Sequence, residues 1–165
     1  MKTTTEYATL LEKLEALKAH LIEAGEATPE ELEGLAPDNC YRDSWDIFEV
    51  IGNEYKVLTE EEADEAAREE IKESVWAFNA DFILTHTTFY RSSSVREDER
   101  FCEALEHMQS SLCESAGPVI MALIEDFNEF AQDAIDADGR GHFIAHYDCE
   151  EHESADGKYL IYWVN

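Results

Sequence analysis

The chain has 165 residues, and its 39 Asp and Glu against 12 Lys and Arg give a formal net charge of −27 at pH 7. Such charge repels nucleic-acid phosphates and anionic lipids, so it argues against direct DNA or membrane binding and favours basic partners. The apolar content of 44 %, with eight Phe, seven Tyr and three Trp, is too high for a disordered acidic chain. The sequence therefore predicts a folded protein.

Features that bear on the cellular compartment point to the cytoplasm. No run reaches the roughly 20 apolar residues of a membrane span, and charges interrupt the amino-terminal segment where a secretory signal would be continuous. The cysteines are widely spaced and form no CxxC motif, so we expect reduced and mostly buried thiols. They are Cys40, Cys102, Cys113 and Cys149. We expect the protein to act in the cytoplasm of a host cell.

The amino-terminal segment has helical periodicity. Residues 5–24 carry leucines at three- and four-residue intervals, which predicts an amphipathic helix that ends at Gly25 and has Glu and Lys on its polar face. Thr28-Pro29-Glu30-Glu31 combines a cap residue, a proline and early acids. This pattern predicts a short helix to about Leu35, ended by Pro37-Asp38-Asn39.

The next segment changes from a helical to an extended pattern and back. Residues 45–51 and 54–58 are rich in aromatic and β-branched side chains and flank Gly52-Asn53, which predicts a hairpin with a two-residue loop. Thr59 and Glu62 then have the spacing of a capping box, which predicts a helix. The expected apolar stripe of that helix is Ala63, Ala67, Ile71, Val75 and Phe78.

The second half predicts two further helices and a hairpin. Residues 85–94 are polar and lack periodicity, as in a loop, and the next helix carries Phe101, Leu105, Met108 and Leu112. A long helix follows Gly117-Pro118 and ends near Asp138-Gly139, with Ile120, Leu123, Phe127, Ala131 and Ala134 facing inward. The aromatic segments "HFIAHYD" and "KYLIYWVN" predict a second antiparallel hairpin.

Together these elements predict an α+β fold that is mainly helical, with a small antiparallel sheet from two hairpins. No repeat, linker or shift in composition divides the chain. We therefore expect a single domain over residues 1–165, with a helical amino-terminal extension (1–36) and an α+β body (37–165).

Acidic side chains recur at helical spacing, and they are the candidate binding residues. Like charges at four-residue spacing cost a few tenths of a kcal/mol per pair, so a solvated helix face is the simplest interpretation for one helix alone. The pattern nevertheless recurs on a second helix and in the final loop. The candidate residues are Glu61, Glu65, Glu69 and Glu73 in the first helix, Glu125, Glu129, Asp133 and Asp136 in the long helix, and Glu150 and Glu151 in the loop.

Regular rows of carboxylates on folded helices can imitate the phosphates of DNA. Successive i, i+4 positions lie about 6 Å apart, an interval comparable with that between phosphates along a strand. Such a mimic would bind a basic nucleic-acid-binding protein or complex of the host. A highly soluble or salt-adapted surface with no partner remains an alternative, and the sequence leaves open whether the amino-terminal helix dimerises.

The segment "DADGRGHFIAHYDCEEHE" holds the types of residue that bind metals. On a strand, His146 and Asp148 would share a face, whereas His142 and His146 would lie about 13 Å apart. A metal-dependent hydrolase using the His142–His152 region is therefore an alternative, but we expect no metal and no cofactor. Asp138-Gly139-Arg140-Gly141 matches no phosphate loop, and we expect a turn in which the glycines accept positive φ and Arg140 pairs with a nearby acid.

The segments "VLTEEEADEAAREEIKESVWAF" and "DGRGHFIAHYDCEEHE…YLIYWVN" resemble small acidic accessory proteins of double-stranded-DNA bacteriophages. The resemblance covers about half of the chain. It implies a phage or mobile-element origin and a dispensable, host-directed role, and it supplies no catalytic residues. Phage inhibitors of restriction and CRISPR systems include acidic DNA mimics, so by analogy we expect a non-enzymatic inhibitor of a host defence complex. A phage structural or regulatory interaction protein is the first alternative, ahead of the metal-dependent hydrolase.

Overall fold

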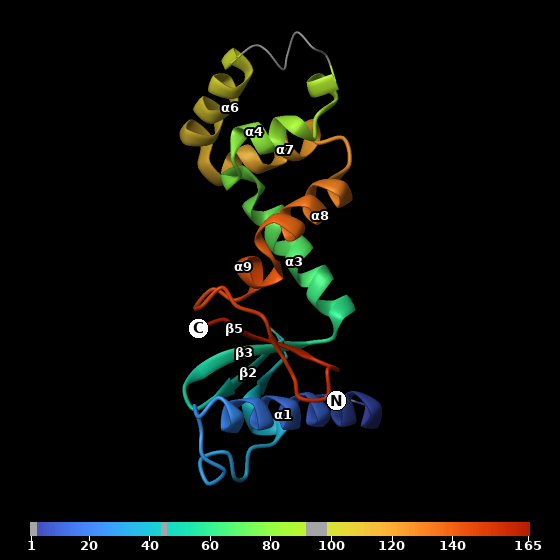
Figure 1. Ribbon diagram of the computed structural model, residues 1–165, viewed down its shortest axis with the longest axis vertical. Helices are drawn as coiled ribbons and strands as arrows, with labels where there is room; N and C mark the ends of the chain where they lie inside the picture. The colour runs from blue at the N-terminus through green and yellow to red at the C-terminus, as the bar shows by residue number, and fades with distance from the viewer. Residues whose placement is uncertain (1–2, 44–45, 92–98) are drawn as a thin grey trace. The chain divides into compact units, whose positions relative to one another are not determined.

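The computed structural model describes residues 3–43, 46–91 and 99–165 (Figure 1). Contacts divide the chain into two compact units. Unit 1 comprises Met1–Ala66 and Arg140–Asn165, and unit 2 comprises Ala67–Gly139. Within the described ranges, no helix has both the length and the apolar composition needed to cross a bilayer.

Unit 1 is built on a five-stranded antiparallel sheet with strand order β1-β2-β3-β5-β4. The strands are β1 (Tyr41–Arg42), β2 (Ile47–Val50), β3 (Asn53–Leu58), β4 (His152–Glu153) and β5 (Leu160–Trp163). The helices of this unit are α1 (Thr4–Glu23), α2 (Pro37–Cys40), α9 (Arg140–Ile144) and the first turns of α3 (Glu60–Ser74). The predicted α+β class with a small antiparallel sheet is confirmed.

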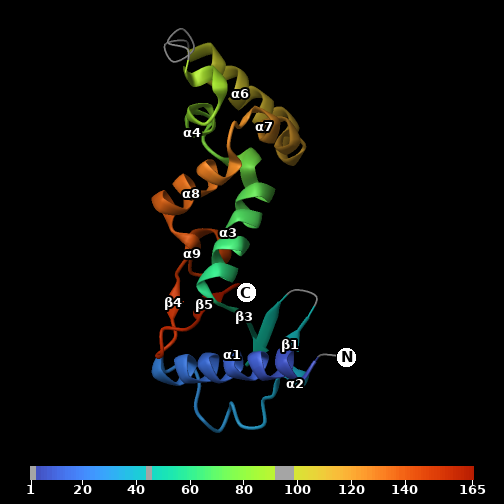
Figure 2. The same cartoon turned by 90° about the vertical axis from the view of Figure 1, so that its right-hand side faces the viewer.

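Helix α1 covers one face of the sheet (Figures 1 and 2). Its leucine stripe, with Leu14 and Leu17 fully buried, packs against Phe48, Val57 and Ile161 in one apolar cluster. Thr3 and Glu6 form a capping box at the start of α1. The predicted helix is therefore confirmed, and burial of its apolar stripe fixes α1 on the sheet.

The opposite face of the sheet carries a different set of side chains. Along β5, Ile161 belongs to the α1 cluster, whereas the next residue, Tyr162, is fully buried outside that cluster. Successive side chains of a strand point to opposite faces, so Tyr162 lies on the side away from α1. Helix α9 contacts β5 and buries Phe143 and Ile144.

Three local predictions in unit 1 are wrong. Residues 29–34 form turns rather than a helix, because Thr28 and Glu31 cap each other but the chain then makes only short i, i+3 contacts up to Gly34, whose φ is +79°. Pro37 begins the short helix α2 instead of ending one. Segment 142–148 is not a strand, since α9 and a turn occupy it. A short apolar run does not distinguish a buried strand from a buried helix.

The first hairpin is confirmed with a shift of one residue in its loop. Val50 pairs with Asn53, so the loop residues are Ile51 and Gly52, with φ of +52° and +81°. A type I′ turn requires positive φ at both loop positions, and glycine at the second position meets that requirement without steric cost. The predicted strand residue Trp45 lies outside the described residues.

The regular elements of unit 2 are all helices within its described residues. Its α-helices are the later turns of α3, α4 (Ala80–Thr85), α6 (Glu99–Leu112), α7 (Gly117–Leu123) and α8 (Phe127–Asp138). Short 3-10 turns cover Val75–Ala77, Thr88–Arg91 and Cys113–Ala116. Thr59 and Glu62 cap α3 reciprocally, as predicted. Helix α4 was not predicted from the sequence, and residues 92–94 of the predicted loop are outside the described residues.

The predicted long helix after Gly117 is in fact two helices. Ile124 is extended and forms an isolated bridge with Thr87, and the Glu125 amide donates to the His86 carbonyl at 2.9 Å. The Asp126 side chain then accepts from the amides of Asn128 and Glu129 and so begins α8 as its N-cap. Glu125 therefore lies in the break and not on the helix. Gly139 ends α8 with φ of +80°, as predicted.

The four cysteines take no part in disulfides. Only Cys40 is buried, while Cys113 and Cys149 are exposed. The prediction that these thiols are mostly buried is therefore wrong.

Candidate functional site

The acidic row on α3 consists of Glu61, Glu65, Glu69 and Glu73, and all four residues are exposed. Four-residue spacing places successive members about 6 Å apart along one edge of the helix. Glu69 lies 3.5 Å from the Lys72 amine. Throughout the described ranges, Glu61, Glu65 and Glu73 form no ion pair. The α3 row therefore presents most of its charge to solvent.

The direct neighbour Glu62 has a structural role instead. Its carboxylate accepts from the amine of Lys13, a residue only 4 % exposed, at 2.7 Å and from the Thr59 amide at 2.8 Å. Burial alone would raise the pKa of Glu62, but these hydrogen bonds outweigh burial and lower that pKa. The structure thus distinguishes Glu62 from Glu61 in the same turn.

The second acidic row, on α8 of unit 2, consists of Glu129, Asp133 and Asp136, all of them exposed. The Asp133 carboxylate lies 3.0 Å from His86 Nε2. The Asp136 carboxylate accepts a hydrogen bond from the side-chain amide of Gln132 at 2.9 Å. Glu129 forms no ion pair within the part of the chain that the structure describes. The fourth predicted member, Glu125, is exposed in the break before α8.

Within unit 2, the two rows come from helices that contact each other. Arg68 of α3 donates to the Gln132 side chain of α8 at 3.4 Å. Unit 2 therefore contains Glu69 and Glu73 of α3 together with the carboxylates of α8, which lie about 60 residues further along the chain. The sequence predicted each row but gave no indication that helices α3 and α8 contact each other.

The two candidate residues of the final loop have different partners. Glu150 is exposed, and its carboxylate lies 3.8 Å from His152 Nε2. Glu151 instead binds Arg140 through both carboxylate oxygens, at 2.9 and 3.0 Å, and accepts a hydrogen bond from the Tyr162 hydroxyl. Arg140 also donates to Asp64 at 3.0 Å. Glu151 therefore holds the loop to the sheet in unit 1.

Burial strengthens this Arg140–Glu151 network. The Arg140 side chain is 17 % exposed, and although burial alone would lower its pKa, the hydrogen bond and negative charge of Glu151 raise it. The pKa of Tyr162 is raised mainly by burial and then by its hydrogen bond to Glu151. The predicted pairing of Arg140 with acids is seen, but with partners distant in sequence. Gly141 is helical, and a Cβ there would lie 2.7 Å from the Cys149 carbonyl, so close backbone approach rather than positive φ requires glycine.

The histidines of the carboxyl-terminal segment are not arranged as the sequence predicted. The strand geometry expected for His146 and Asp148 is wrong, because α9 and a turn occupy that segment. His152 lies 3.5 Å from Asp148, and its ring centroid is 5.0 Å from that of His20. Among the residues that the structure describes, no group of three or more His, Cys, Asp or Glu is arranged to hold a metal ion.

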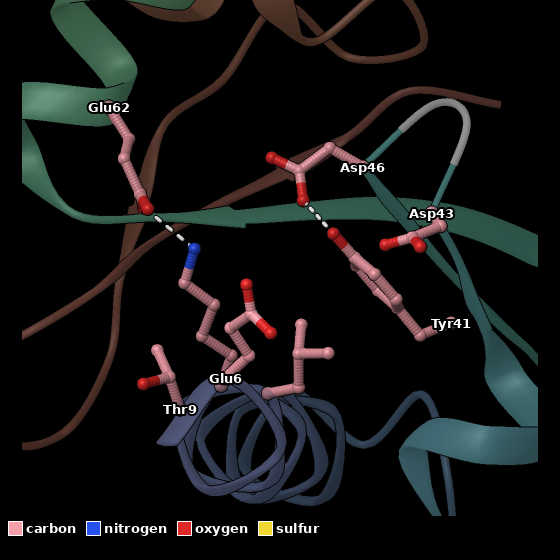
Figure 3. A pocket seen from close by; sticks show the side chains of 8 residues that line it. Glu6, Thr9, Tyr41, Asp43, Asp46 and Glu62 are labelled. Carbon is pink, nitrogen blue, oxygen red and sulfur yellow. Dashed lines mark hydrogen bonds and ion pairs between the residues drawn. The ribbon is translucent and has the colours of Figure 1, made fainter. Parts of the chain in front are cut away.

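A pocket of about 450 Å³ in unit 1 was not predicted from the sequence (Figure 3). Lys13 lies within it and is paired with Glu62, and the Tyr41 hydroxyl donates to Asp46. Burial, and then the hydrogen bond to Asp46, raise the pKa of Tyr41. Lys13 was expected on the solvated face of α1, and its burial corrects that prediction. The lining residues are Glu6, Thr9, Leu10, Lys13, Tyr41, Asp43, Asp46 and Glu62.

Comparisons with protein-family models, curated proteins and solved structures gave no match to this chain.

Proposed function

We propose that this protein is an acidic DNA mimic that occupies the basic nucleic-acid-binding channel of a host defence complex, such as a CRISPR effector or a restriction enzyme. By filling that channel it prevents DNA from binding. No catalytic step is required for this function. The proposed contacts are the exposed members of the α3 row and the α8 row, together with Glu125 and Glu150.

The observation that carries the proposal is the regular spacing of unpaired carboxylates on folded helices. Glu61, Glu65 and Glu73 on α3 and Glu129 on α8 are exposed and form no ion pair within the described ranges. Holding like charges at this spacing costs stability rather than adding to it. A basic groove that normally binds phosphates would offset this cost on association.

The distribution of cations also supports the proposal. The chain has only 12 Lys and Arg, and several of them are paired with carboxylates outside the α8 row. These are Lys13, Lys18, Arg42, Arg140 and Lys158. Local pairing therefore leaves the exposed rows with a large uncompensated negative charge, which attracts basic partners at long range.

The test is capture of host proteins on the tagged full-length chain, with washes at low and high salt and identification by mass spectrometry. We expect a DNA-binding defence complex to be retained at low salt, released at high salt and displaced by duplex DNA, because all three responses follow from competition for phosphate-binding cations. A captured complex that survives high salt and ignores DNA would contradict the proposal.

A further inference from the structure

Three aromatic rings of unit 1 stack in series. Tyr55 of β3 and Trp163 of β5 are cross-strand partners, with ring centroids 5.9 Å apart. Tyr147, from the turn after α9, stacks on Trp163 with a centroid separation of 4.0 Å and an interplanar angle of 23°. The Tyr147 amide also donates to the Trp163 carbonyl at 3.4 Å. The sequence pattern gave no indication of this stack, because the segment of Tyr147 was expected to be a strand.

Exposure rises steeply along the stack. Tyr55 is 3 % exposed, Trp163 is half-buried, and Tyr147 is 65 % exposed. The Trp163 indole N–H donates to the Asn165 carbonyl at 2.9 Å, which helps to fix the middle ring. Trp163 therefore covers one face of the Tyr147 ring, while much of that ring remains open to solvent. A supported ring of this kind binds a planar group with little loss of conformational entropy.

Two acidic residues follow Tyr147 closely in the chain, and their carboxylates lie 3.5 Å (Asp148) and 3.8 Å (Glu150) from His152 Nε2. Asp148 directly follows Tyr147, and its side chain accepts from the Glu150 amide at 3.0 Å, which orients the turn. Burial is the main cause that raises the pKa of the Tyr55 phenol, and the negative charges of Glu26 and Asp148 add to it in smaller part. The open ring therefore lies in a negative electrostatic environment.

The negative charge around Tyr147 determines which kind of partner can bind to this ring. An apolar partner that covered this acidic turn would have to desolvate its carboxylates without pairing them, which is unfavourable. A second copy of the chain would bring another formal charge of −27 to the same surface. An arginine side chain suits both features, since its planar guanidinium stacks on an aromatic face while its N–H groups donate to carboxylates.

We propose that Tyr147, supported by Trp163 and followed in the same turn by Asp148 and Glu150, is a docking point for an arginine side chain of the basic partner protein. This inference rests on the proposed function and deepens it. Arginines in nucleic-acid-binding proteins stack on bases and pair with phosphates. At this docking point the tyrosine ring takes the place of an unstacked base, and the neighbouring carboxylates take the place of its phosphate.

The experiment compares nona-arginine with nona-lysine, two peptides of equal charge, as probes for the full-length protein. Binding is followed by titration calorimetry and by the NMR shift of the Trp163 indole N–H. We expect tighter binding of the arginine peptide, and we expect Tyr147→Leu to weaken that binding by about fivefold to tenfold while changing lysine-peptide binding by less than about twofold. Tyr147→Phe keeps the aromatic face and should retain the arginine preference.

Leucine preserves apolar bulk at this exposed position, and thermal unfolding verifies that the variant is folded. Phe89→Leu is the matched control, because Phe89 is an exposed aromatic of unit 2, 49 % accessible to solvent. An arginine preference that persists undiminished in Tyr147→Leu, or that is absent from the wild-type protein, would overturn the inference. Neither result depends on DNA competition for a captured host complex, so this failure is distinguishable from failure of the proposed function.

Discussion

Glu151 and Glu129 show that one residue type lies in two contrasting environments in this protein. In unit 1, Glu151 binds Arg140 with both oxygens and accepts from Tyr162, with its side chain only 29 % exposed. In unit 2, Glu129 is exposed on α8 and has no cation partner among the described residues. The comparison teaches that net charge alone does not identify a binding surface. Carboxylates already committed to the fold must first be set aside.

Helix α3 repeats this contrast within a single turn. Glu61 and Glu62 are both exposed, but Glu62 caps the helix and pairs with the buried Lys13, whereas Glu61 forms no ion pair within the described ranges. The two residues are adjacent in sequence, but their side chains leave the helix in different directions and therefore meet different neighbours. If the contrast is correct, substitutions at paired carboxylates should reduce stability, and substitutions at exposed carboxylates should reduce only binding.

The largest expected difference in stability is between Glu151→Ala and Glu129→Ala. Among the described residues, removal of Glu151 leaves Arg140, 17 % exposed, with Asp64 as its one carboxylate partner and leaves the Tyr162 hydroxyl without its acceptor. We expect a loss of about 2–4 kcal/mol in the free energy of unfolding, against less than about 0.5 kcal/mol for Glu129→Ala. Urea denaturation measures both values, and equal losses would remove the distinction.

A smaller difference is expected between Glu62→Gln and Glu61→Gln. Glutamine can still cap α3, so Glu62→Gln isolates the charge that pairs with Lys13, a residue 4 % exposed. We expect a loss of about 1–2 kcal/mol for Glu62→Gln and almost none for Glu61→Gln. Thermal and urea unfolding provide the measurement. A loss of similar size in Lys13→Met would support the pairing, whereas no loss in either variant would refute it.

The same pair makes a prediction about pH. The pKa of Glu62 is lowered from its ordinary value of 4.5, so its ionised form stabilises the folded state. That contribution is fully present above about pH 4.5 and is lost as the pH falls through the lower folded-state pKa. We therefore expect the stability difference between the wild type and Glu62→Gln to shrink on acidification below pH 4.5. A difference that stays constant to pH 3 would show that Glu62 does not act through its charge.

The smallest expected change in stability has the opposite sign. The α3-neutral variant combines Glu61→Gln, Glu65→Gln, Glu69→Gln and Glu73→Gln. It removes pairs of like charges at four-residue spacing, and each such pair costs a few tenths of a kcal/mol. We expect the free energy of unfolding to rise by about 0.5–1 kcal/mol, measured by urea denaturation. A clear loss of stability would indicate that the α3 row supports the fold.

Local patterns in the sequence predicted those parts of the fold that depend on local physics. The leucine stripe of α1, the Thr59–Glu62 capping box and the stop at Gly139 depend on neighbours within a few residues, and all are confirmed. The first hairpin was also found, although its loop shifted by one residue. The α+β class followed from these elements.

The errors arose where distant contacts decide local structure. The break between α7 and α8 depends on Ile124 and Glu125 meeting Thr87 and His86, which no local pattern reveals. The burial of Lys13 likewise depends on Glu62, 49 positions away. The acidic rows were predictable because helical spacing is local. The role of Glu151 was not, because its partners Arg140 and Tyr162 come from separate elements. The prediction of a single domain with a helical extension stays a prediction.

The central claim is that the exposed carboxylates, and not the acidic composition as a whole, bind the partner. The most direct test measures the dissociation constant of the captured host complex at low salt for the wild type, the α3-neutral variant and a control with the same change in charge. The control combines Glu30→Gln, Glu33→Gln, Glu103→Gln and Glu114→Gln, all at exposed positions outside the acidic rows. We predict about 100-fold weaker binding and a shallower salt dependence for the α3-neutral variant, with less than about threefold weakening for the control. Equal weakening in both variants would contradict the claim.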